Sequence, residues 1–177
     1  FEQKQLQNVV LAGHSAGGAI SIRYMARHQG HGVSKLVLIA AAAPTSFTPE
    51  TAERYLAVNS GDRPNLIRHV TDSFFFRYAT EPFREWFISL GLQAAGWSTA
   101  AMIRLLRDTN LANDLAAINV PTLIMHGIHD QVVPFAMAQE QHARIPQSRL
   151  VPFQYSGHGL FWEEREEFNR LIAEFAG

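Results

Sequence analysis

The chain contains no cysteine, which excludes disulfide bonds, thiolate nucleophiles and zinc sites built from cysteine. Positive charge is not in excess, since 15 Lys and Arg stand against 16 Asp and Glu, so neither nucleic acid nor an anionic membrane is expected as a partner. The longest apolar stretch, at residues 33–44, is interrupted by Ser34 and Lys35 and is far shorter than the roughly 20 residues that cross a bilayer. Residues 1–4 do not resemble a signal peptide. We therefore expect a soluble protein of the cytoplasm.

What the chain does have is apolar material for one packed domain, with 47% hydrophobic and 18% charged residues among 177. Its apolar runs are continuous rather than alternating, which is typical of strands buried on both faces of a parallel sheet. These runs lie at residues 8–13, 35–40, 121–127 and, more weakly, 149–153, and helical patterns at residues 19–28, 136–145 and 161–176 separate or follow them. The pattern predicts an α/β fold with a parallel sheet.

The strand pattern disappears between residues 45 and 118, where the sequence becomes helical. Thr48 and the following Pro-Glu pair predict a helix start, and residues 84–92 and 100–111 predict further helices. The whole chain has 19 aromatic residues, 12 Phe, 3 Trp and 4 Tyr, and this segment holds 10 of them. These ten form the core of the segment, line an apolar substrate pocket beneath it, or do both. We predict a helical cap at 45–118 inserted between two parts of an α/β core, residues 1–44 and 119–177.

Residues 13–17 match the pattern G-x-S-x-G, which occurs by chance about 0.04 times in a chain of this composition. Ser15 lies between a predicted buried strand and a predicted helix, the setting of a tight turn that presents a nucleophilic serine. We attribute Gly13 and Gly17 to this turn, because side chains at both positions would collide there. The helix that follows directs its free N–H groups at the serine, so the Ala16 N–H is the expected oxyanion donor.

A serine hydroxyl becomes a good nucleophile only when a base removes its proton. Among the eight histidines, His158 is best placed for that role, in a glycine-flanked loop directly after the last predicted strand. His14, beside the serine, is expected to point elsewhere and to pack or hydrogen-bond near the pocket. His126 and His129, at the exit of the third strand, remain ambiguous. No such setting surrounds the other four: His28, His31, His69 and His142.

Asp130 is the candidate for the acid that orients the histidine, because it directly follows the third predicted strand. Parallel strands place their carboxyl ends at one edge of a sheet, so Ser15, Asp130 and His158 are expected at the same edge. The alternative is an aspartate that only caps a turn. The order serine, aspartate, histidine along the chain is the order of hydrolases with this type of turn.

With these motifs the whole chain resembles the α/β-hydrolase superfamily. Segments 23–28, 33–41, 126–134 and 157–161 are similar to its cofactor-free haloperoxidase and aryl-esterase branch. The resemblance implies Ser15 as nucleophile, Asp130 as acid and His158 as base. It further implies hydrolysis of esters, peracid formation from carboxylic acids and hydrogen peroxide, and no need for metal, haem or nucleotide. His14 and Ala16 depart from the branch, which more often has an aromatic residue before the serine and a larger one after it.

A second departure is the position of the turn, which follows roughly the fifth strand in this superfamily but here begins at residue 13. We therefore expect the N-terminal strands to be absent from these 177 residues, together with the loop that donates the second oxyanion N–H. An N-terminal segment or a second chain is then expected to pair with the apolar edge of the first strand.

These observations favour a serine hydrolase that cleaves a small or aromatic carboxylic ester through an acyl-enzyme. A ligand receptor or signalling protein that keeps the three residues, and a non-catalytic part of a hydrolase, are the alternatives. Turnover of short p-nitrophenyl esters distinguishes the first from the other two.

Overall fold

A central parallel sheet organises the computed structural model, which describes residues 2–45 and 47–177. In the described part of the chain its strands are β1 (Val9–His14), β2 (Val33–Ile39), β3 (Thr122–Gly127) and β4 (Ser148–Phe153), in the order β1-β2-β3-β4. All three pairings are parallel, with Leu11 opposite Leu36, Leu38 opposite Ile124, and Ile124 opposite Leu150. The α/β fold class predicted from the sequence is confirmed.

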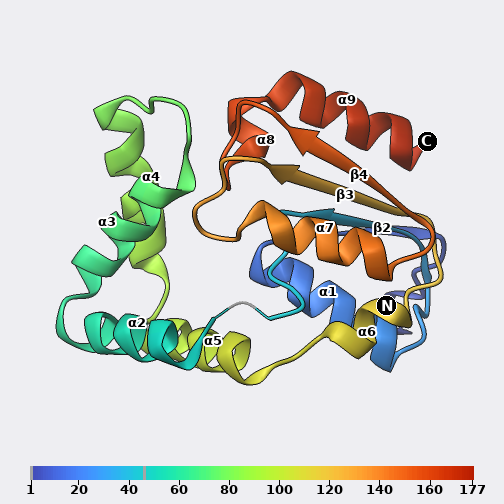
Figure 1. Cartoon of the computed structure of the whole chain (residues 1–177), viewed down its shortest axis with the longest axis horizontal. Helices are drawn as coiled ribbons and strands as arrows, with labels where there is room; N and C mark the ends of the chain where they lie inside the picture. The colour runs from blue at the N-terminus through green and yellow to red at the C-terminus, as the bar shows by residue number, and fades with distance from the viewer. Residues whose placement is uncertain (1, 46) are drawn as a thin grey trace.

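Helices cover both faces of this sheet (Figure 1). One face packs against α1 (Ala16–Arg27), α6 (Ala112–Ala116) and α7 (Phe135–Arg144), and the core there includes Leu36, Leu38 and Ile124. The other face packs against α8 (Leu160–Glu163) and α9 (Arg165–Ala176), and Leu123 and Met125 belong to that second core. Since consecutive strand residues point to opposite faces, two covered faces require the continuous apolar runs seen in the sequence.

A group of helices between β2 and β3 extends beyond the sheet (Figure 1). These helices are α2 (Pro49–Gly61), α3 (Arg63–Phe74), α4 (Glu81–Gln93) and α5 (Gly96–Asp108). Thr48 caps α2, since its hydroxyl oxygen accepts a hydrogen bond from the Thr51 N–H at 3.1 Å. The helices predicted at residues 84–92 and 100–111 begin three and four residues too late, because α4 begins at Glu81 and α5 at Gly96.

The predicted single helix at residues 161–176 was wrong in detail, because it is two helices with a break at Glu164. The backbone of Glu164 leaves the helical region, with φ −124° and ψ 45°. Its carboxylate accepts hydrogen bonds from the Tyr155 N–H at 3.0 Å and the Ser156 hydroxyl at 2.6 Å. The break therefore coincides with contacts to the preceding loop, which no helical periodicity reveals.

Strand β1 lies at one edge of the sheet and pairs only with β2 in the described residues. Most of its residues are partly or fully exposed, whereas every residue of β3 is buried. The expectation that another segment or a second chain pairs with this edge stays a prediction.

No helix in the described residues is long and apolar enough to cross a membrane. A short 3₁₀ helix, η1 (Glu2–Lys4), precedes β1.

Candidate active site

Ser15 occupies the turn between β1 and α1 with a positive φ of 53° and a ψ of −122°. This conformation is strained for a residue with a Cβ and persists only when the surrounding structure enforces it. Here the Ser15 N–H donates to the Ile39 carbonyl at 2.9 Å, and the Ser15 carbonyl accepts from Ala42 at 3.0 Å and Gly18 at 2.9 Å. Sheet and helix together therefore hold the serine in a strained turn, with the Ala16 N–H in the first turn of α1, where N–H groups lack acceptors within the helix.

Of the two glycines predicted to provide space in this turn, one does so and the other does not. A Cβ on Gly13 would lie 2.5 Å from the Gly17 carbonyl oxygen and from Ser21 Oγ, so Gly13 is needed for space. A Cβ on Gly17 would meet nothing within 4 Å, so the predicted collision at this position was wrong. The second tight position is Gly18, where a Cβ would lie 2.3 Å from Ala41 Cβ. The close contact is thus between α1 and the segment after β2.

Asp130 and His158 form a buried pair after β3 and β4. His158 Nδ1 lies 2.7 Å from Asp130 Oδ2, and Asp130 Oδ1 accepts the N–H groups of Val132 and Val133, each at 2.8 Å. Burial raises the pKa of Asp130, but hydrogen bonds from His126, His158 and Val133 outweigh it and hold this pKa well below its ordinary value. The carboxylate is therefore ionised and accepts the His158 Nδ1–H, which leaves His158 Nε2 as the nitrogen that can take a proton.

His14 links the serine turn to this pair. Its Nε2 donates to the His158 carbonyl at 3.2 Å, and the two rings lie 4.7 Å apart. The ring centroids of Phe74 and Phe161 lie 5.9 and 5.2 Å from the centroid of the His14 ring. Burial and the neighbouring His158 lower the pKa of His14 to about 4, so at neutral pH the ring is uncharged and fills an aromatic environment beside Ser15.

The structure brings the predicted residues together to different degrees. Asp130 and His158 are in direct contact, whereas Ser15 is joined to them through its neighbour His14. Within the described residues, Ser15 Oγ forms no hydrogen bond with His158; such bonds are often long in structures without ligand. Of the two ambiguous histidines, His129 stacks on Phe76 with ring centroids 3.7 Å apart, and His126 contacts Asp130 at 3.1 Å.

Glu163 is a polar residue next to the candidate site that the sequence motifs did not single out. Its Oε1 accepts the N–H groups of Phe76 and Arg77 at 2.8 and 2.6 Å, and its Oε2 accepts the Gly157 N–H at 2.7 Å. One carboxylate thus joins the inserted segment to the residue before His158. The only signal in the sequence is an acidic residue five positions after the histidine of a glycine-flanked loop, whose free N–H groups need an acceptor.

An apolar cavity of about 430 Å³ lies between the helices of the insertion and the loop after Asp130. Its wall is mainly apolar and aromatic, and Gln131 and Val132 bring it next to the acid; further lining residues include Phe47, Tyr55, Val70 and Met102. Some of the aromatic residues therefore line a cavity, while Phe74, Phe75, Phe83 and Phe87 pack against one another.

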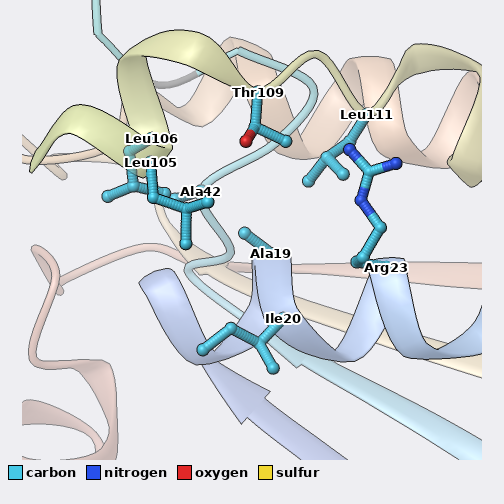
Figure 2. Close-up of a pocket in the computed structure, with 8 residues that line it drawn as sticks. All are labelled: Ala19, Ile20, Arg23, Ala42, Leu105, Leu106, Thr109 and Leu111. Carbon is cyan, nitrogen blue, oxygen red and sulfur yellow. The ribbon is translucent and has the colours of Figure 1, made fainter. Parts of the chain in front are cut away.

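A smaller hollow of about 120 Å³ lies between α1 and the segment from α5 to α6 (Figure 2). Ala19, Ile20 and Arg23 line it from α1, opposite Leu105 and Leu106. Arg23 pairs with Asp114 at 2.9 Å, so its charge is already compensated. None of Ser15, Asp130 and His158 lines this hollow.

Comparisons with known proteins identify the family and the fold of the chain. The model of the alpha/beta hydrolase family matches residues 2–171. The AB hydrolase superfamily protein YisY of Bacillus subtilis is 45% identical over 97% of this chain and 68% of its own length. A non-heme haloperoxidase of Rhodococcus erythropolis is 30% identical over 96% of this chain and 68% of its own. Among solved structures, an esterase from Exiguobacterium antarcticum superimposes with a TM-score of 0.95 at 36% identity, covering 99% of this chain and 69% of that one. The chain thus spans about two thirds of each relative.

Proposed function

This chain belongs to the alpha/beta hydrolase family, and we propose that it cleaves a small or aromatic carboxylic ester with a triad of Ser15, Asp130 and His158. The observation that carries the proposal is the buried hydrogen bond between Asp130 and His158, at the same edge of the sheet as a strained serine turn. Its esterase-like and haloperoxidase-like relatives support the same class of chemistry.

The proposed reaction proceeds in two acyl transfers. Ser15 Oγ forms a bond to the ester carbonyl carbon while His158 Nε2 takes the hydroxyl proton. The Ala16 N–H stabilises the negative oxygen that develops, and the alcohol leaves with the proton from His158. Water then attacks the acyl-serine with His158 again as the base, which releases the carboxylic acid and restores Ser15. Asp130 stays ionised throughout and orients the imidazole.

The cavity beneath the insertion supports the choice of an uncharged, apolar substrate group. Most of its wall is apolar, and none of the described residues that line it is Asp, Glu, Lys or Arg. A pocket of this kind favours an alkyl or aryl group over a charged one. A perhydrolase side activity is the second candidate, because the Rhodococcus relative is named a haloperoxidase; assays with hydrogen peroxide and acetate measure it.

Substitution of Ser15 by alanine tests the proposal. We expect loss of roughly 10⁴-fold or more in the turnover of p-nitrophenyl acetate, with an unchanged melting temperature. A serine-directed phosphonate is expected to label Ser15 and no other serine. Retention of more than about a tenth of the rate would contradict the assignment. One equivalent of product without further turnover would instead favour a receptor that is acylated once, and neither labelling nor turnover would favour a non-catalytic protein.

A further inference from the structure

His126 is a polar residue at a fully buried position of β3. Its three predecessors on the strand, Leu123, Ile124 and Met125, are equally buried and apolar. His126 Nε2 lies 2.8 Å from the Val133 carbonyl oxygen and 3.1 Å from Asp130 Oδ2. A buried imidazole is unfavourable unless its hydrogen bonds are made, so these two contacts are what accounts for a histidine here.

The two contacts determine the tautomer of His126. A carbonyl oxygen and a carboxylate only accept hydrogen bonds, so Nε2 must carry the hydrogen and share it between Val133 and Asp130. Nδ1 is buried and has no hydrogen-bond partner among the described residues. Nε2 is therefore the nitrogen through which His126 makes its polar contacts.

We infer that His126 is a positioning residue, which acts on catalysis through Asp130; this inference rests on the proposed function. Asp130 Oδ2 receives N–H groups from both His126 and His158, and Oδ1 receives two backbone N–H groups. These four donors fix the plane of the carboxylate. The bond from His126 to Val133 also ties the far end of the acid loop to the end of β3, so the loop keeps Oδ2 directed at the His158 ring.

The inference is tested first in the unaltered protein, by ¹⁵N nuclear magnetic resonance of the histidine rings at neutral pH. We expect a hydrogen on Nε2 of His126 and a low-field hydrogen on Nδ1 of His158. An Nε2 without a hydrogen at His126 would overturn the inference. This measurement needs neither a variant nor catalytic activity.

Two substitutions then separate the hydrogen-bond donor from the bulk of the ring. In His126→Gln the side-chain nitrogen can reach the place of Nε2, and we expect at least a third of the wild-type kcat. In His126→Met no donor remains, and we expect kcat to fall roughly 10- to 100-fold, the effect of one hydrogen bond to a charged group, with KM changed less than threefold. Met125→Leu, on the opposite face of β3, is the matched control for disturbance of the strand and is expected to match the wild type.

The outcomes distinguish the roles of His126. Wild-type kcat and an unchanged low-field proton in His126→Met would show that the donor does nothing. Equal loss in His126→Gln and His126→Met, with unchanged melting temperatures, would indicate that His126 is itself the base. If the wild type lacks esterase activity and phosphonate labelling, the proposed function fails. The low-field proton of His158, retained in His126→Gln and displaced in His126→Met, then still supports the positioning contact; no difference between them would overturn it.

Discussion

Replacement of Glu163 by alanine is expected to weaken both the attachment of the inserted helices and the catalytic rate. The carboxylate accepts three short N–H bonds, two from Phe76 and Arg77 and one from Gly157. Phe76 and Arg77 are exposed and can bind water instead, whereas Gly157 is buried. A buried donor left without a partner costs about 1–3 kcal/mol, and we add about 1 kcal/mol for the exposed pair, because hydrogen bonds that water replaces contribute little. The expected loss of unfolding free energy is therefore about 2–4 kcal/mol.

The rate is expected to fall because Gly157 precedes His158. Release of the Gly157 N–H loosens the loop that aims the imidazole, and a displacement of about 1 Å at a catalytic group can reduce the rate about 100-fold. We expect a 10- to 100-fold lower kcat. Glu163→Gln is expected to have a smaller effect of about 1 kcal/mol, because its oxygen still accepts two N–H groups while its amide nitrogen faces the third.

Urea unfolding and p-nitrophenyl acetate turnover measure the two effects. Glu166→Ala is the matched control, since Glu166 is exposed and lies in the first turn of α9; it is expected to stay within about 0.5 kcal/mol of the wild type. If Glu163→Ala had the same stability and kcat as this control, the carboxylate would not couple the two segments and the reasoning would be refuted.

Two further predictions concern the serine turn. The folded state lowers the pKa of His14 from 6.5 to about 4, so the unfolded chain binds a proton there first as the pH falls. The wild type is therefore expected to lose up to about 3 kcal/mol of unfolding free energy between pH 6.5 and pH 4. His14→Phe is expected to lose correspondingly less in denaturant titrations across that range. Gly18→Ala is expected to lower the unfolding free energy by about 1–3 kcal/mol, because its Cβ would collide with Ala41. Gly17→Ala is expected to be neutral or slightly stabilising in the same assay, and the reverse order of these two glycine variants would refute the steric argument.

The parallel sheet and the edge that carries the candidate site were predictable from the sequence. Continuous apolar runs require strands with two covered faces, and the structure has them, with Leu38 and Met125 in opposite cores. Since parallel strands end at one edge, residues that directly follow strands lie near that edge. The candidates Ser15, Asp130 and His158 could therefore be proposed from their positions alone, without knowledge of any side-chain direction.

Tertiary structure alone decided which atoms meet at that edge. His126 contacts Asp130, whereas His129 stacks on Phe76. Which of the two histidines reaches the acid depends on the direction in which each side chain leaves the end of β3. Likewise Glu163 reaches Phe76, 87 positions earlier in the chain. Periodicity reports only whether a residue faces the interior or the solvent. Hydrogen bonds of a few ångströms depend on the relative placement of segments far apart in sequence, and only packing of the whole chain determines that placement.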